Sequence, residues 1–97
     1  MEIKNVELGK VLEISVKIIW LGEPKDVFNK GFDIQPAIVK DVESEDKTDP
    51  TAYLDIKQPY INQFEVGDKI KLLNSFVKER RVGNQKWFTN VNKIEKL

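Results

Sequence analysis

Short stretches in which apolar and polar residues alternate are the feature that most limits how this chain can fold. Leu12, Ile14 and Val16 alternate with polar residues in the stretch 11–21, and the stretches 51–57 and 69–73 show the same two-residue period. Neighbouring side chains on a strand point to opposite faces, so this period predicts half-buried β-strands. Residues 32–42 read as a further strand, in which Pro36 indicates an edge or a bulge because proline cannot donate to a ladder.

Turn signals separate these strands and organise them into one domain, residues 1–97. Five strands are expected, at about 11–21, 32–42, 51–57, 69–80 and 86–92, with an N-terminal arm at 1–10 and a C-terminal tail at 93–97. The segment 58–64 is too short for a regular helix and predicts a single helical turn that closes the bottom of the core. Regularly spaced short strands are typical of an all-β sandwich or barrel.

Five strands with a plug between the third and the fourth favour a five-stranded Greek-key β-barrel, the OB-fold, with SH3-like barrels as the main alternative. The expected core residues share the inward phase of their strands. They are Leu12, Ile14, Val16, Ile38 or its neighbours, Leu54, Ile70, Leu72 and Val77.

The fourth strand carries a break in its alternation at Leu73-Asn74. A β-bulge near Asn74-Ser75 would explain the break, because one extra residue turns every later side chain to the other face. Phe76, Lys78 and Arg80 would then share the outward face. An exposed aromatic ring beside cations suits a single-stranded nucleic-acid platform, where rings stack on bases and cations meet phosphates. The alternative is a buried Phe76 beside a solvated basic edge.

The composition excludes several classes of site. The chain has no cysteine and no histidine, so it has no disulfide framework, no thiolate zinc site and no histidine general base. It also lacks a phosphate-binding or dinucleotide-binding glycine loop. The acidic stretch 41–49 lacks the spacing of a calcium-binding loop and reads as solvated. We therefore expect a protein without enzymatic activity or cofactor. Neither a membrane-length apolar run nor a signal peptide is visible, which predicts a cytoplasmic protein.

Charge is segregated along a chain whose net charge is zero. Residues 41–55 contain six acidic residues and one lysine, a net charge of −5. Residues 68–86 contain six basic and two acidic residues, a net charge of +4. Bulk charge therefore predicts no non-specific binding, yet a basic face can exist on the molecule.

Four motifs follow one another along the chain: LEISVKIIWLGEP, then AIVKDVES, then VGDKIKLLNSFV, and finally KIEK. In this order they resemble the archaeal single-stranded DNA-binding proteins and the OB domains of replication protein A. The resemblance implies a role in DNA replication or repair and assigns base stacking to Phe76. Arg80 stands where the family often has a second aromatic residue, and Lys17 matches a basic residue that faces the nucleic acid. Asp55 replaces an exposed tryptophan, which leaves Tyr53 as the nearest substitute.

The predicted interface combines aromatic and basic side chains that bind single-stranded DNA, with RNA as the alternative ligand. These residues are Lys17, Tyr53, Phe76, Lys78, Arg80, Arg81, Lys86 and Trp87. Trp87 and Phe88 are neighbours on one strand, so only one of them can point inward. Parity with Thr89 and Val91 favours Trp87 inward, whereas the family match places Phe88 in the core. Trp20 either caps the barrel or contributes to binding. The alternative function is a protein-interaction subunit of a replication-protein-A-like complex, with other replication or repair proteins as partners.

Overall fold

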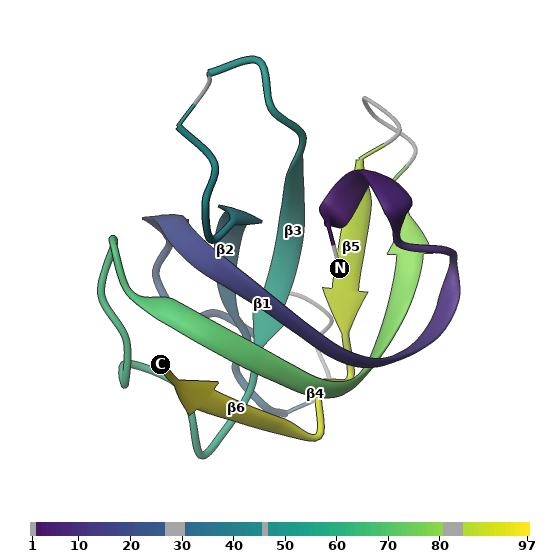
Figure 1. Ribbon diagram of the computed structural model, residues 1–97. Helices are drawn as coiled ribbons and strands as arrows, with labels where there is room; N and C mark the ends of the chain where they lie inside the picture. The colour runs from purple at the N-terminus through teal and green to yellow at the C-terminus, as the bar shows by residue number, and fades with distance from the viewer. Residues whose placement is uncertain (1, 27–30, 46, 81–84) are drawn as a thin grey trace.

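Six strands and one 3-10 helix make up the computed structural model, which describes residues 2–26, 31–45, 47–80 and 85–97 (Figure 1). The elements are η1 (Ile3–Asn5), β1 (Gly9–Leu21), β2 (Gln35–Asp41), β3 (Thr51–Ile56), β4 (Lys69–Glu79), β5 (Lys86–Thr89) and β6 (Lys93–Lys96). No helix in this part of the chain is long and apolar enough to cross a membrane.

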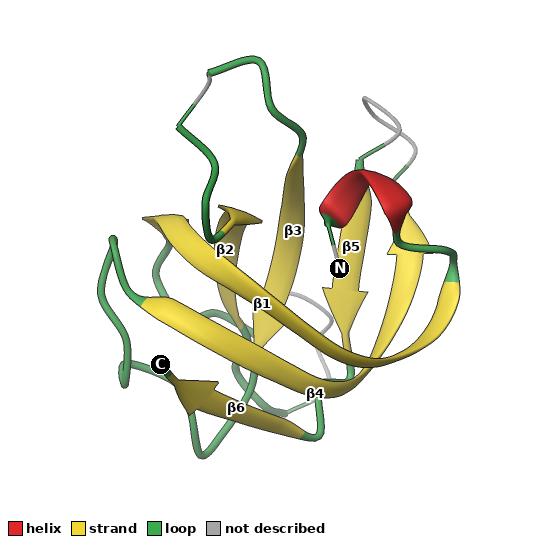
Figure 2. Cartoon of the chain, in the orientation of Figure 1, coloured by secondary structure: helices red, strands yellow, loops and turns green. Residues whose placement is uncertain are grey.

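The strands close into a barrel in the order β1-β2-β3-β5-β4, with β4 pairing back onto β1 (Figure 2). All of these pairings are antiparallel except β3 with β5, which is parallel. β1 serves both halves of the barrel, because its N-terminal part pairs with β4 and its C-terminal part with β2. The predicted five-stranded OB-type barrel is therefore confirmed.

The core lies inside the barrel and contains Phe88 as its largest fully buried side chain. Ile14, Val16, Leu54, Ile70, Leu72 and Val77 are buried as predicted, and Ala37 and Val39, the neighbours of Ile38, are fully buried. The prediction for Leu12 was wrong, since it is 68% exposed while Val11 is buried.

Leu12 faces outward because the alternation of inward and outward side chains shifts by one residue in both β1 and β4, at paired positions of the two strands. In β4 the inward residues are Ile70 and Leu72 before Asn74, and Ser75 and Val77 after it. Asn74 has φ 53, a left-handed conformation that asparagine tolerates better than most residues. The change of phase at Asn74 is thus confirmed. The pairing with β1 keeps one register on both sides of Asn74, so the expected extra residue against β1 is not found.

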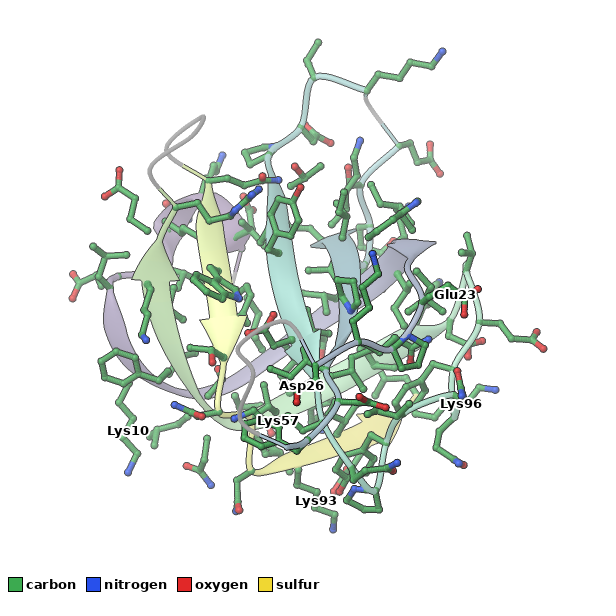
Figure 3. All side chains as sticks on the ribbon, turned by 180° about the vertical axis from the view of Figure 1, so that it is seen from behind. Lys10, Glu23, Asp26, Lys57, Lys93 and Lys96 are labelled. Atoms are coloured by element: carbon green, nitrogen blue, oxygen red, sulfur yellow. The ribbon has the colours of Figure 1, made fainter. Side chains whose placement is uncertain are left out.

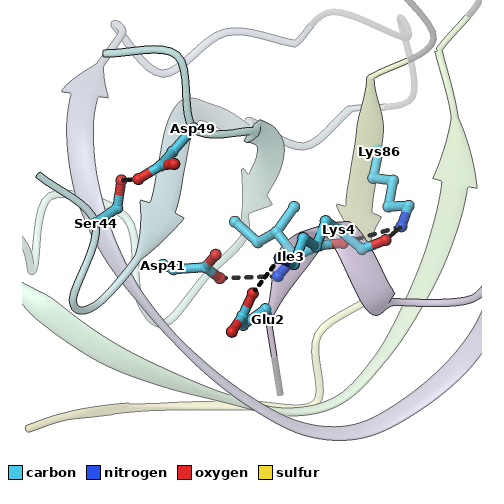
Figure 4. Close-up of polar contacts among 7 residues, drawn as sticks. All are labelled: Glu2, Ile3, Lys4, Asp41, Ser44, Asp49 and Lys86. Atoms are coloured by element: carbon cyan, nitrogen blue, oxygen red, sulfur yellow. Dashed lines mark hydrogen bonds and ion pairs between the residues drawn. The ribbon is translucent and has the colours of Figure 1, made fainter. Parts of the chain in front are cut away.

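η1 closes one end of the barrel with its buried residue Ile3, followed by the buried Val6. The backbone N–H of Ile3 donates to Asp41 Oδ1 over 2.8 Å. Lys86 Nζ donates to the carbonyl oxygens of Ile3 and Lys4 over 2.9 and 3.3 Å (Figure 4). The segment predicted as an arm is therefore fixed to β2 and β5, and its last two residues begin β1.

Residues 57–68 close the opposite end of the barrel (Figure 1). Ile61 is buried, and the partly buried Tyr60 and Phe64 pack against the core with their ring centroids 6.3 Å apart. Two successive turns shape the segment, closed by the bonds from Tyr60 N to Lys57 O and from Gln63 N to Tyr60 O. The plug predicted here closes the core as expected. It consists of turns, and the 3-10 helix of the described chain is η1.

The C-terminal residues form a strand where the sequence predicted a tail. β6 pairs with residues 70–73 of β4, on the edge that β5 occupies farther along the strand. Ile94 is buried and anchors the strand to the core. With one apolar residue among KIEK, the segment lacks the repeated alternation that would have indicated a strand.

Candidate nucleic-acid interface

A row of side chains crosses the outer face of the barrel at right angles to its strands. Trp20 on β1 pairs with Ile38 on β2, Ile38 with Tyr53 on β3, Tyr53 with Trp87 on β5, and Trp87 with Lys78 on β4. Trp20 is 46% exposed, and Ile38, Tyr53 and Trp87 are partly exposed. Hydrogen-bonded strands lie about 4.8 Å apart, so the backbone ladder sets the spacing of the row.

Local sequence explains why these side chains face outward. Ala37, Leu54 and Phe88 point into the core, so their neighbours Ile38, Tyr53 and Trp87 point away from it. On β1 a register irregularity between Ile18 and Trp20 brings Trp20 opposite Ile38. Phe88 in the core with Trp87 on the outer face agrees with the family-based prediction.

Glycine at position 22 gives the Trp20 ring its place at the end of the row. A Cβ atom at this position would lie 2.7 Å from both the Trp20 ring and the Pro36 side chain. Trp20 is 46% exposed and lies outside the buried core, with its ring beside Gly22; its role as a cap or as a binding residue stays a prediction.

Two cations sit on the rings of this row. The Arg80 guanidinium carbon is 3.6 Å from the centroid of the Tyr53 ring, and Lys78 Nζ is 5.8 Å from that of Trp87. Both geometries are favourable cation–π contacts. The Arg80 guanidinium covers one face of the Tyr53 ring, so a base that arrives on that face would stack on the guanidinium, whereas the more distant Lys78 ammonium adds a positive charge above Trp87.

A groove of about 220 Å³ opens beside Trp87, between β3, β5 and the residues that lead into β2. Its lining includes Phe32, Asp55, Lys57 and Asn90. Figure 3 views the barrel from this side, with Lys57 near the end of β3. Lys57 Nζ donates to Asn90 Oδ1 over 2.7 Å and lies 5.6 Å from the centroid of the Phe32 ring.

Among the described residues that line this groove, Asp55 is the one acidic residue. Burial raises the pKa of its carboxyl group above the ordinary value. A hydrogen bond from the Trp87 side chain and the nearby charges of Lys57 and Lys78 act in the opposite direction. Burial outweighs these interactions, so the charged form of Asp55 is disfavoured relative to a carboxyl group in water.

The structure brings together four of the predicted site residues: Tyr53, Lys78, Arg80 and Trp87. Phe76 faces outward as predicted, at 45% exposure, two residues before Lys78 on β4. Arg81 lies outside the described residues.

Two predicted residues lie elsewhere. Lys86 points towards η1, where its ammonium group binds backbone carbonyl oxygens. Lys17 is on β1, which adjoins neither β3 nor β5. Its Nζ donates to the carbonyl oxygen of Ser44 in the acidic stretch 41–49, here called the acidic loop.

Sequence reasoning missed Ile38 and Phe32 and did not decide the role of Trp20. The outward phase of Trp20 and Ile38 could have been read from their strands only with the register in hand. Phe32 stood in a segment read as a strand, whereas it precedes β2 and is 44% exposed.

The acidic loop borders a second hollow, of about 380 Å³, lined by Asp41, Glu43 and Asp49 among others. Ser44 is buried there and donates to Asp49 Oδ2 over 2.7 Å (Figure 4). Glu43 and Glu45 are exposed. Within the described part of the chain, no three carboxylate side chains are grouped so that they could hold a metal ion.

Comparison with known proteins adds no family assignment. No family model matches this chain. A search of curated proteins likewise finds no similar sequence.

Proposed function

We propose that this protein binds single-stranded nucleic acid, single-stranded DNA first, across the row Trp20–Ile38–Tyr53–Trp87–Lys78. The observation that carries the proposal is the row itself: three aromatic rings and an isoleucine, aligned by register over the outer face of an OB-type barrel. Bases of a duplex are already stacked on one another, so an exposed row of rings selects unpaired bases. Each stacked base contributes roughly 1–3 kcal/mol.

Positive charge over the rings supports the same ligand. Lys78 lies over the Trp87 ring and Arg80 over the Tyr53 ring, so each can pair with a phosphate, and a base above Tyr53 stacks on the Arg80 guanidinium that the ring supports. The net charge of the protein is zero, so affinity depends on stacking in addition to these local cations. The proposed role is binding, without catalysis or a cofactor.

The resemblance of the motifs to archaeal single-stranded DNA-binding proteins and to replication protein A supports DNA replication or repair as the setting. In that reading Phe76 extends the stacking surface along β4. Lys86 and Lys17 contribute to folding, because their ammonium groups bind backbone carbonyl oxygens.

The experiment is a titration of fluorescently labelled oligonucleotides of mixed sequence, single-stranded and duplex, followed by anisotropy. We expect single strands to bind more tightly, and Tyr53→Ala to weaken single-strand binding roughly tenfold, because the ring that supports the Arg80 guanidinium as a stacking surface is lost. Val66→Ala is the matched control, since Val66 is an exposed apolar residue in the turn before β4. Equal binding of single strands and duplex, or no binding of either, would contradict the proposal.

A second candidate, a protein-interaction subunit, is favoured by one observation. Three apolar residues are exposed on neighbouring segments: Leu8 just before β1, Leu12 in β1 and Phe76 in β4. Phe76 pairs directly with Lys10 of β1. Phe76→Ala separates the two functions. If Phe76 stacks on a base, the variant should lose roughly tenfold or more in single-strand affinity and keep its stability. If single-strand affinity is unchanged, Phe76 does not stack on a base, which favours the protein-interaction function.

A further inference from the structure

The groove beside Trp87 combines two aromatic rings with hydrogen-bonding groups, and only part of this combination serves stacking. Phe32 is 44% exposed and Trp87 is partly exposed, so each offers a ring to a flat ligand. Asp55, Lys57 and Lys78 line the same groove. Asp55 accepts a hydrogen bond from the Trp87 side chain, and contacts to phosphates and ring faces would leave its remaining acceptor sites unused.

Asp55 retains acceptor capacity towards a ligand. A carboxylate offers about four lone-pair sites, and Trp87 occupies one of them with its hydrogen bond. The indole bond also fixes the position of the carboxylate relative to the ring on which a base would stack. Lys57 lines the groove with Asp55 and carries the opposite charge, so the groove presents both an acceptor and a donor.

This pattern of donors and acceptors is complementary to one kind of base edge. Cytosine presents its N4 amino group as a donor, next to acceptors on the same edge, and carboxylates accept from that amino group. Thymine has a carbonyl oxygen where cytosine has the amino group, and this oxygen would face the Asp55 carboxylate. The two pyrimidines have rings of the same size, so stacking alone distinguishes them little.

We propose that this groove is a base-recognition pocket in which Asp55 selects an unpaired base with an exocyclic amino group, cytosine before thymine. The proposal rests on the proposed function, since it concerns which base the same face prefers. It also accounts for the acidic residue in a face that otherwise carries cations, because Asp55 meets a base edge while Arg80 and Lys78 meet phosphates.

The experiment compares oligo-dC and oligo-dT of about 12 nucleotides, within the footprint of one OB-fold, at neutral pH and one salt concentration. The full-length protein should bind oligo-dC roughly tenfold more tightly, the discrimination expected from one good base contact. Asp55→Asn should bring the ratio close to one, chiefly by weakening oligo-dC binding. Phe32→Ala should weaken oligo-dC binding without changing thermal stability, since its ring is exposed.

Glu43→Gln is the matched control for charge, because it removes one negative charge from the exposed acidic loop. Its oligo-dC to oligo-dT ratio should equal that of the wild type. Equal binding of the two oligonucleotides by the wild type would overturn the base-recognition proposal and leave single-strand binding intact. A preference for oligo-dC that survives in a folded Asp55→Asn protein would overturn the role of Asp55. Binding of neither oligonucleotide would overturn the proposed function itself.

Discussion

Leu12 and Leu72 are two leucines of the paired strands β1 and β4 with opposite environments. Leu72 is fully buried, whereas Leu12 is exposed. Leu72→Ala should lower the free energy of unfolding by roughly 2–5 kcal/mol, because it removes buried surface and leaves a cavity. Leu12→Ala should change it by less than about 0.5 kcal/mol, as surface substitutions usually do. Urea denaturation of both variants measures the difference, and equal losses would refute the change of phase at Asn74.

Asp55 should make stability depend on pH in a defined direction. Burial is the main cause of its raised pKa, so the folded state binds the proton more tightly than the unfolded state does. Stability from this group is fully present below the unfolded value, near 3.8, and is lost as the pH rises through the higher folded value. Relative to Asp55→Asn, the wild type should therefore gain stability as the pH falls from neutral towards 4.

Thermal denaturation of both proteins over this pH range tests the prediction. Because the amide oxygen of the substituted side chain could still accept from Trp87, the comparison isolates the titration of the carboxyl group. A difference in stability that is constant with pH, or that grows towards neutral pH, would contradict it.

Among the elements, β5 carries neighbouring side chains with separate tasks. Lys86 fixes η1 through its ammonium group, while the next residue, Trp87, belongs to the outer row. Lys86→Met should lower the free energy of unfolding by about 1 kcal/mol, since hydrogen bonds from a charged donor are lost at a partly exposed site. Its affinity for single strands, measured per folded molecule, should stay unchanged.

Lys78→Met on β4 is the matched comparison, because Lys78 is exposed and lies over the Trp87 ring. This variant should keep its stability and bind single strands more weakly. The slope of log affinity against log salt concentration should become shallower by about one. If Lys86→Met instead flattened the salt dependence, Lys86 would bind phosphate, as the sequence pattern predicts.

Much of the element order could be predicted because alternation survives wherever a strand has one buried face. β3 and the first half of β4 follow it, and their core residues were predicted correctly. Leu12 was assigned to the wrong face because its strand changes phase where it crosses Asn74, and nothing in the local sequence of β1 marks that point. β6 was missed because four residues with one buried side chain give no period.

At the scale of the whole molecule, the carboxylates of the acidic loop should repel the phosphates of the proposed ligand. Glu43 and Glu45 are exposed, so neutralising both to glutamine should leave the melting temperature unchanged. The double variant should bind single strands more tightly at low salt, and the gain should shrink as added salt screens the loop over about 8–10 Å. Oligonucleotide titrations at several salt concentrations measure this, and a gain that is independent of salt would contradict it.

The site could be predicted only in part, because it depends on how distant strands align. Tyr53, Lys78, Arg80 and Trp87 were chosen by residue type and phase, and the fold brings them together. The contact of Arg80 with Tyr53 and the groove around Asp55 depend on register between β3, β5 and β4. Register is set by the packing of the complete barrel, so a reading of single strands could not yield the row or the groove.

The parallel joint between β3 and β5 spans only three residue pairs, from Ala52–Lys86 to Leu54–Phe88. Tyr53 lies on one side of this joint, and Trp87, Lys78 and Arg80 lie on the other. Nucleic acid bound across the row would therefore contact both sides of the β3–β5 pairing and hold the two strands together. Amide groups of paired strands exchange with solvent when the pairing opens transiently, so a bound ligand should slow hydrogen exchange in β3 and β5 more than in β6.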